Sequence, residues 1–266
     1  MAGASGVMAG ADVKSDLPLR SVIGIALATV AIGVLWAGGA VLWALLTLVA
    51  VIALIEWAGL VKAHRARLGI GLIVLIVGMS YALPMVWGPE RSALALLLIA
   101  AMLMSLFPKA GLTAIGVGYI GTAAISILFL RAQPLGFVLA LWTLAIVWAT
   151  DIGAFFAGRA IGGPKLAPVI SPNKTWAGLI GGMIVAAVAG GAIAYVGHLP
   201  TRTYWLAPLL AVAAQLGDLA ESGMKRRVGV KDSGYILPGH GGLLDRIDGM
   251  LPVAILVAAL VANGNL

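Results

Sequence analysis

The sequence SGMKRRVGVKDSGYILPGHGGLLDRID, residues 222–248, is a polar stretch within a chain that is otherwise mostly apolar. Glycine recurs along it, and it combines cations with carboxylates: Lys225, Arg226, Arg227, Lys231, Arg246, Asp232, Asp245 and Asp248. Such a stretch is costly near a bilayer unless it lines a site. Carboxylates alone favour a metal and cations alone favour phosphate, so the mixture predicts a site for metal-bound phosphate groups.

The composition indicates a membrane protein. Of the 266 residues, 62% are hydrophobic and only 10% are charged, which is too little charge for the surface of a soluble domain. The apolar runs are continuous rather than alternating, which indicates helices and argues against a β-barrel. We therefore expect an all-α, polytopic integral membrane protein. The absence of cysteine excludes disulfide bonds and cysteine-ligated metals.

The apolar runs predict about nine transmembrane helices. They cover residues 21–37, 40–61, 68–88, 92–107, 112–130, 135–156, 176–197, 203–224 and 247–263. Pro84 is expected to kink the third of them. We divide the chain into a flexible cytoplasmic tail at 1–17, N-terminal transmembrane helices at 18–134 and a catalytic transmembrane region at 135–266.

The distribution of cations predicts the orientation. With the N-terminus inside, only Arg91, Arg131 and Arg202 of the 17 Lys and Arg residues fall outside. An odd number of spans then places the C-terminus outside and every motif at the cytoplasmic face. We expect an integral protein of the cytoplasmic (inner) membrane of a bacterium. The formal charge of +7 suits loops near anionic lipid, and because it is spread over short loops it does not indicate nucleic-acid binding.

Acidic residues at helical spacing predict a metal site. Asp218, Ser222 and Lys225 share one face at the end of the eighth predicted helix, and Asp245 and Asp248 lie three residues apart at the start of the ninth. Carboxylates without a His or Cys cluster favour Mg²⁺ over zinc. We predict Asp218, Asp245 and Asp248 as the ligands. Two alternatives need no metal. The end of the eighth helix could carry an i,i+4 ion pair between Glu221 and Lys225, and Asp245 and Asp248 could cap the ninth helix.

Two further segments are candidates for phosphate contacts. In the turn at 238–242, the N–H groups of Gly239, Gly241 and Gly242 form a potential anion-binding nest, with His240 as a hydrogen-bond donor rather than a base. The second segment, residues 171–176, precedes the seventh predicted helix. There Ser171 and Thr175 either cap the helix or bind phosphate beside Lys174, and both interpretations stay open.

The polar stretch resembles the signature of phosphatidate cytidylyltransferases, also called CDP-diacylglycerol synthases. The matching positions, all at the family's spacing, are Ser222, Lys225-Arg226, Lys231-Asp232, residues 238–242 and Asp245-Arg246-Ile247-Asp248. Residues 151–155 and 215–221 are also similar to the family, so the resemblance extends from about residue 151 onward. Two positions depart from it: Ala177 stands where the family usually has Glu, and Gly249 where it usually has Ser.

The resemblance implies a Mg²⁺-dependent enzyme that converts CTP and phosphatidate into CDP-diacylglycerol and pyrophosphate. A second cation is possible, as is a homodimer. The resemblance implies a catalytic set of Asp218, Lys225, Arg226, Lys231, Asp245, Arg246 and Asp248. It implies substrate binding by Ser171, Lys174, Thr175, Ser222, Gly239, His240, Gly241 and Gly242.

Other functions were weighed against this one. A CTP-dependent polyprenol kinase also handles CTP at a membrane. A CDP-alcohol phosphatidyltransferase has a motif that begins like Asp245-x-x-Asp248-Gly249, but the rest of that motif is missing here. A non-enzyme alternative is an ion-coupled transporter, which needs ionisable residues near the centres of its spans. Apart from Glu56 and Glu90, the acids cluster at predicted cytoplasmic helix ends, which argues against transport.

Overall fold

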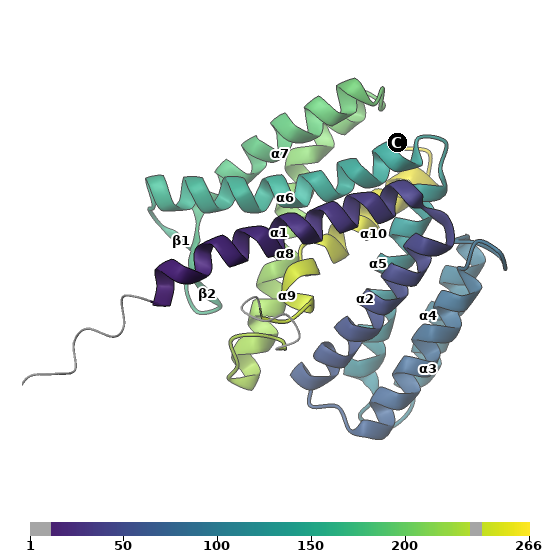
Figure 1. Cartoon of the computed structure of the whole chain (residues 1–266). Coiled ribbons are helices and arrows are strands. Elements are labelled where there is room, and N and C mark those ends of the chain that lie inside the picture. Colours follow the sequence, from purple (N-terminus) through teal and green to yellow (C-terminus); the bar gives the residue numbers. More distant parts are fainter. Residues whose placement is uncertain (1–11, 235–240) are drawn as a thin grey trace, which may run out of the picture.

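The computed structural model describes residues 12–234 and 241–266, with side chains from residue 24 onward, and this part is all-α except for one short β-hairpin. Figure 1 labels the elements, which are α1 (Asp12–Ala37), α2 (Gly39–Leu60), α3 (Arg65–Tyr81), α4 (Arg91–Ser105), α5 (Gly111–Ala132), α6 (Gly136–Ile161), β1 (Lys165–Ala167), β2 (Ser171–Thr175), α7 (Trp176–Val196), α8 (Arg202–Val228), α9 (Leu244–Ile247) and α10 (Met250–Ala262). Each apolar run predicted as a span corresponds to helical structure, and the all-α expectation is confirmed.

The predicted and observed helices differ at particular ends. Helix α1 begins at Asp12, within the stretch that we expected to precede the first helix. Helix α3 ends at Tyr81, so Pro84 follows that helix and the predicted kink within it is wrong. Prolines commonly follow helix ends because they cannot continue the backbone hydrogen-bond ladder.

The ninth predicted helix, 247–263, overlaps α9 only at Ile247, and the regular apolar helix α10 begins at Met250, with Asp248 and Gly249 as the division between α9 and α10. Pro252 explains the division. It lacks the N–H that would bond to the carbonyl of Asp248 four residues earlier, and its ring excludes that carbonyl from a regular helix. Pro252 itself lies in the first turn of α10, where proline is tolerated. Asp248 therefore lies outside the apolar helix, in the connection that precedes it.

The loop predicted between the sixth and seventh helices is partly ordered as a hairpin. Helix α6 continues to Ile161, and the chain then turns at Gly162 and Gly163, both with positive φ. Strands β1 and β2 pair antiparallel, with Lys165 opposite Thr175. The Thr175 side chain then accepts a hydrogen bond from Gly178 N (3.0 Å) and caps α7, so the hairpin leads directly into the next helix.

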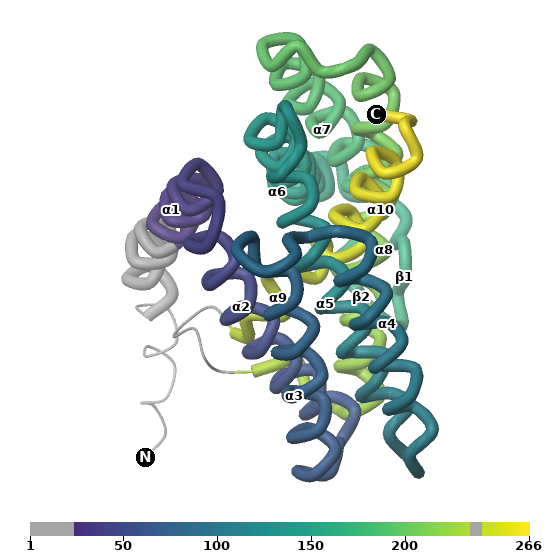
Figure 2. Tube along the Cα trace, turned by 90° about the vertical axis from the view of Figure 1, so that its right-hand side faces the viewer, coloured from purple at the N-terminus to yellow at the C-terminus, as the bar shows by residue number. Residues whose placement is uncertain are grey.

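Two groups of helices meet at α10. Helix α5 is central to one group, since it contacts α2, α3, α4, α6 and α10, whereas α6, α7 and α8 pack on one another in the second group. Helix α10 contacts α5, α6 and α8, and α9 rests on α2 (Figures 1 and 2). The segment that carries Asp245 and Asp248 therefore lies at the junction of the two groups.

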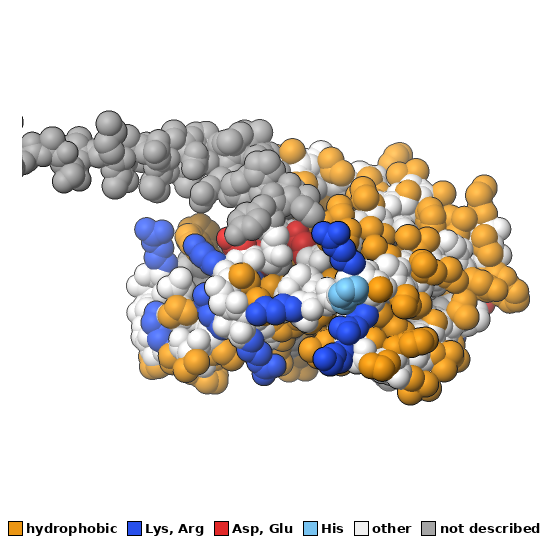
Figure 3. All heavy atoms as spheres, turned by 90° about the horizontal axis from the view of Figure 1, so that it is seen from below, with side chains coloured by type: hydrophobic (Ala, Val, Ile, Leu, Met, Phe, Trp, Pro, Cys, Tyr) orange, Lys and Arg blue, Asp and Glu red, His pale blue; other side chains and the backbone are white. Residues whose placement is uncertain are grey.

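The apolar helices identify an integral membrane protein. In the described residues, α2, α5, α6 and α7 are long and apolar enough to cross a bilayer, and the shorter apolar helical stretches are Gly24–Ala37, α4 and α10. Large apolar side chains such as Ile73, Phe156 and Val188 are exposed on the helix surfaces, as expected for groups that face lipid. Lys and Arg side chains, together with some acids and a histidine, gather on one end of the molecule (Figure 3).

Candidate active site

The candidate site is built from the end of α8, the strand β2 and the segment around α9. Asp218 on α8 forms an ion pair with Lys174 on β2, with 2.6 Å between Oδ2 and Nζ. Ser222, one turn further along α8, donates its hydroxyl to Asp218 Oδ1 (3.2 Å). Residues from β2 and α8 therefore meet on the Asp218 carboxylate.

A second ion pair joins α8 to α9. Lys225 Nζ lies 2.7 Å from Asp245 Oδ1 and 3.6 Å from Glu221 Oε1. The Lys225 and Asp245 side chains are only 12% and 11% exposed, so water screens this pair weakly. Removing either partner would therefore leave a largely buried charge uncompensated between α8 and α9.

Asp245 is also an acceptor for the backbone around it. Gly242 N donates to its Oδ2 at 2.9 Å, and Ser233 N lies 3.1 Å from the same oxygen. Burial alone raises the pKa of Asp245, but hydrogen bonds from Glu221, Lys225 and these backbone N–H groups outweigh it and lower that pKa below its usual value. Asp245 is therefore held as a carboxylate.

Asp248 has a different environment. Its Oδ1 accepts a hydrogen bond from Gly249 N (2.7 Å). Burial, followed by the negative charge of Asp218, raises the pKa of Asp248 from 3.8 to about 6. An excess of carboxylates that repel one another is typical of a place that binds a cation.

The three predicted metal ligands lie in one region but do not form a ready-made metal cage. Among residues 12–234 and 241–266, no group of three or more His, Asp or Glu side chains is placed to hold a metal ion. The physical reason is that Asp218 and Asp245 face Lys174 and Lys225. Their hard oxygen donors still suit Mg²⁺, which needs only one or two carboxylates when substrate phosphates supply the other ligands.

The other three cations predicted for the site are on the surface. Arg226 is exposed, and its Nε donates to the Ile170 carbonyl (3.3 Å), which links α8 to the hairpin. Lys231 and Arg246 are exposed as well. These three cations are accessible to an anionic substrate from the surface.

The predicted phosphate-binding turn is described only in part. Gly239 and His240 lie outside the described residues. Gly241 has a φ of 79°, a value that favours glycine, and the N–H of Gly242 donates to Asp245. That N–H is therefore engaged within the protein in this arrangement.

The hairpin residues separate into two kinds. Thr175 is buried and caps α7, which is the capping alternative of the two left open. Ser171 pairs with Ala167 at the other end of β2 and is half-buried. Lys174, between them, is the hairpin residue whose charge reaches the acidic cluster.

Two acids that were not assigned to the site belong to its surroundings. Glu221 on α8 is 5% exposed and lies beside Lys225. Glu56 on α2 is also 5% exposed, and it accepts hydrogen bonds from Leu243 N (3.0 Å) and Leu244 N (2.7 Å). A lone acid in an apolar helix is a signal for such a role, but the sequence does not say which segment it meets.

The two positions that depart from the resembled signature fit their surroundings. Ala177 lines an apolar pocket with Phe156 and Ile161. At Gly249, a Cβ would lie only 3.3 Å from the Ala214 carbonyl oxygen, so the small residue lets this connection approach α8.

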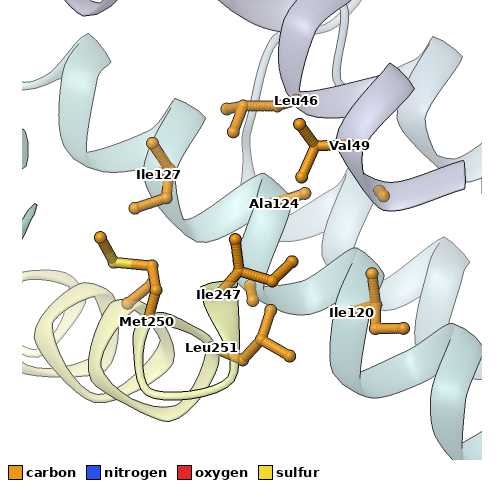
Figure 4. Close-up of a pocket in the computed structure, with 11 residues that line it drawn as sticks. Leu46, Val49, Ile120, Ala124, Ile127, Ile247, Met250 and Leu251 are labelled. Carbon is orange, nitrogen blue, oxygen red and sulfur yellow. The ribbon is translucent and has the colours of Figure 1, made fainter. Parts of the chain in front are cut away.

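An apolar cavity of about 60 Å³ lies behind the site, between α2, α5 and the α9–α10 segment. Its lining includes Leu46, Ile120, Ile247 and Leu251, whose side chains point into the space shown in Figure 4. Its lining is almost entirely apolar, so it offers no partner for a phosphate group. It marks where α9 and α10 rest on the first helix group rather than a substrate site.

Comparison with known proteins gives a consistent result. The model of the cytidylyltransferase family matches residues 18–263. The phosphatidate cytidylyltransferase of Brucella suis biovar 1 (strain 1330) is 39% identical over 257 residues, which cover 91% of this chain and 92% of the relative. The phosphatidate cytidylyltransferase of Staphylococcus aureus (strain COL) is 34% identical over 265 residues, which cover 92% of this chain and 99% of the relative.

Proposed function

The chain belongs to the cytidylyltransferase family, and from this membership we infer that it is a phosphatidate cytidylyltransferase, a nucleotidyltransferase of phospholipid synthesis. The observation that carries this function is similarity over nearly the whole length of both chains. The reaction transfers CMP from CTP to phosphatidate and gives CDP-diacylglycerol and pyrophosphate.

The reaction requires little acid–base chemistry from the protein. A phosphate monoester has a second pKa of about 6, so phosphatidate is largely a dianion at neutral pH. One of its phosphate oxygens attacks the α-phosphorus of CTP, and the bond from that phosphorus to the bridging oxygen of the β-phosphate breaks. Pyrophosphate leaves with the electron pair. The protein must position two polyanions and offset their charge.

We assign Asp218, Asp245 and Asp248 to hold Mg²⁺. Their oxygen donors suit this ion, and the charge of Asp218 acts on Asp248, so a bound cation would relieve the repulsion of the two carboxylates. When bound, Mg²⁺ supplies charge neutralisation for the CTP phosphates. The resemblance to the family supports this use of Mg²⁺, and a second cation would draw on the same acids.

We assign the surrounding cations to the substrate phosphates. Lys174 pairs with Asp218 and Lys225 pairs with Asp245, so each lysine would pair with a substrate phosphate if its aspartate were to hold a metal ion. Every charge stays compensated during this exchange, which avoids leaving a buried charge alone. The exposed cations Arg226, Lys231 and Arg246 hold the remaining negative charge and the leaving pyrophosphate. Ser171, Ser222 and the glycine-rich turn of Gly239, His240, Gly241 and Gly242 complete the binding assignment, whereas Thr175 caps α7.

For the membrane topology, we propose nine spans in the cytoplasmic membrane, with the N-terminus inside and the C-terminus outside. The three arginines assigned to the outside support this arrangement. Arg91 and Arg202 donate to the carbonyls of Ala262 and Asn265 at the end of α10, and Arg131 donates to two carbonyls at the end of α1. The charged site lies at the other end of α10, which we place at the cytoplasmic face. Residues 18–134 then form the N-terminal helices and 135–266 the catalytic region.

A direct assay tests the function. Purified protein in detergent is given phosphatidate and CTP labelled in the α-phosphate, with Mg²⁺ or with EDTA. We expect labelled CDP-diacylglycerol and an equal amount of pyrophosphate, with turnover lost in EDTA. No labelled lipid from phosphatidate, or transfer of the CTP γ-phosphate to a polyprenol, would contradict the assignment.

A further inference from the structure

Glu56 lies far from the signature in sequence but contacts it directly. It is the acid of α2, in the first helix group, and it is 5% exposed. Its Oε1 accepts a hydrogen bond from Leu243 N, and its Oε2 accepts from Leu244 N and from the Ser233 hydroxyl (3.1 Å). The three donors come from both sides of residues 235–240.

Glu56 and Asp245 divide the donors of this segment between them. Three consecutive backbone N–H groups are used in turn, since Gly242 donates to Asp245, and Leu243 and Leu244 donate to Glu56. Ser233 is held twice, through its N–H by Asp245 and through its hydroxyl by Glu56. The two carboxylates therefore tie the segment at 233 to the segment at 242–244.

The glycines beside these donors are required by close approach. A Cβ on Gly234 would collide with Glu56 Oε1, and a Cβ on Gly242 would collide with the Ser233 hydroxyl and lie 2.7 Å from Glu56 Oε2. Only glycine lets both backbone segments reach the Glu56 carboxylate. The glycines at 234 and 242 are thus explained by Glu56, which lies on α2.

The hydrogen bonds to Glu56 also fix the direction of α9. Helix α9 has only four residues, too few to fix its own direction through internal hydrogen bonds. Its first N–H groups end on Glu56, and Asp245 is the second residue of the helix. The direction in which Asp245 points therefore depends on Glu56.

We propose that Glu56 is a positioning residue, which acts through Ser233 and the start of α9 to hold Asp245 at the orientation needed for the reaction. This inference rests on the proposed function of the site. It assigns a role in catalysis to the N-terminal helices, although the family signature lies wholly in the second half of the chain.

The test compares Glu56→Gln with Thr47→Val in the full-length protein. Gln is isosteric, but one oxygen becomes an NH₂ group that faces a backbone N–H. Thr47 lies in the same helix, and its hydroxyl has no hydrogen-bond partner in the described part of the chain, so Thr47→Val should behave as wild type. For Glu56→Gln we expect kcat to fall about 10- to 100-fold and the Mg²⁺ concentration for half-maximal rate to rise, as for other groups that orient metal ligands.

Hydrogen exchange provides a readout that does not depend on activity. The amides of Leu243 and Leu244 should exchange faster in Glu56→Gln, whereas exchange in α5 and α6 stays unchanged. A general loss of protection would indicate global destabilisation of Glu56→Gln. The Mg²⁺ requirement of Ser233→Ala would then test the positioning role instead. Ser233→Ala removes one contact to Glu56, and a rise in the Mg²⁺ requirement without a general loss of protection supports the proposal.

Three outcomes would overturn the inference: wild-type kinetics in Glu56→Gln, a lower kcat with an unchanged Mg²⁺ requirement, or a wild-type Mg²⁺ requirement in Ser233→Ala. If the wild-type protein itself makes no CDP-diacylglycerol, the proposed function fails instead. The exchange measurement still shows in that case whether Glu56 holds residues 243 and 244.

Discussion

Lys225 Nζ on α8 lies 2.7 Å from Asp245 Oδ1 on α9, so a cation assigned to phosphate and a carboxylate assigned to metal neutralise each other in this structure. Lys174 and Asp218 repeat the relationship at 2.6 Å. The Lys225–Asp245 pair is largely shielded from water, whereas the Asp218 side chain is 33% exposed. The opposite charges of the candidate site are therefore paired with one another in this structure.

Replacing the two aspartates of the signature should have different effects on stability. Asp245 accepts from Lys225 and two backbone N–H groups, so Asp245→Asn should lose activity and also roughly 1–3 kcal/mol of stability. Asp248 accepts from the neighbouring Gly249 N–H and from the Glu221 carboxyl, but the charge of Asp218 repels it, so Asp248→Asn should lose activity with a smaller change in stability. Turnover and thermal unfolding in detergent measure both. Either variant keeping more than a tenth of the wild-type rate contradicts its role.

The raised pKa of Asp248 predicts a pH dependence of stability without Mg²⁺. Burial and then the charge of Asp218 raise that pKa from 3.8 to about 6, so the folded protein binds the proton more tightly than the unfolded chain. This contribution is complete below pH 3.8 and is lost as the pH rises through about 6. In EDTA, Tm should fall across this window and Asp248→Asn should flatten the fall. Asp245, whose pKa is lowered, changes its contribution only in more acidic solution. If Tm falls with pH as steeply in Asp248→Asn as in the wild type, Asp248 is not the cause of the fall.

Gly217 and Gly223, on the same helix, provide a matched pair for the packing of the site. A Cβ on Gly217 would collide with the Asp248 carbonyl and lie 2.8 Å from Pro252 Cγ, whereas a Cβ on Gly223 meets nothing closer than 3.9 Å. Gly217→Ala should therefore displace Asp218 relative to Asp248, with a loss of activity and roughly 1–3 kcal/mol of stability. Gly223→Ala should be tolerated, because alanine favours a helix more than glycine does. Equal behaviour of the two variants would mean that this close approach is unimportant.

The cations can be tested against a simple effect of surface charge. Lys174→Ala and Arg226→Ala should lower kcat/KM for CTP by roughly 2 kcal/mol each, because a charge-assisted hydrogen bond to phosphate is lost. Arg65 is exposed at the start of α3, outside the site, and Arg65→Ala should have little effect. CTP is varied at fixed phosphatidate in detergent. Equal losses in Arg65→Ala and Arg226→Ala would show a diffuse field rather than specific contacts.

The proposed topology can be tested with single cysteines, since the chain has none. Val169 is 90% exposed in the hairpin turn, and Thr201 is exposed before α8. In intact cells, an impermeant thiol reagent should label Thr201→Cys and leave Val169→Cys unlabelled until the membrane is opened. The reverse pattern would invert the orientation.

The sequence predicted the helices because apolar runs and their polar ends are local properties. The same holds for the approach of Asp218, Ser222 and Lys225, which share one helix face at the end of α8. The break between α9 and α10 was not predicted, although Pro252 is a local signal for it. The hairpin was not predicted, because three- and five-residue strands are stabilised only by pairing with each other and by their attachment to α8.

The sequence by itself determined the class of protein, the positions of its helices and a signature with the chemistry of a phosphate and metal site. Only the tertiary structure decided which charges are paired, namely Lys174 with Asp218 and Lys225 with Asp245. It also decided that Glu56 belongs beside the signature. Helix periodicity relates residues a few positions apart, whereas these contacts join separate helices. Which buried donor meets which buried acceptor depends on how those helices pack, and no local pattern encodes that.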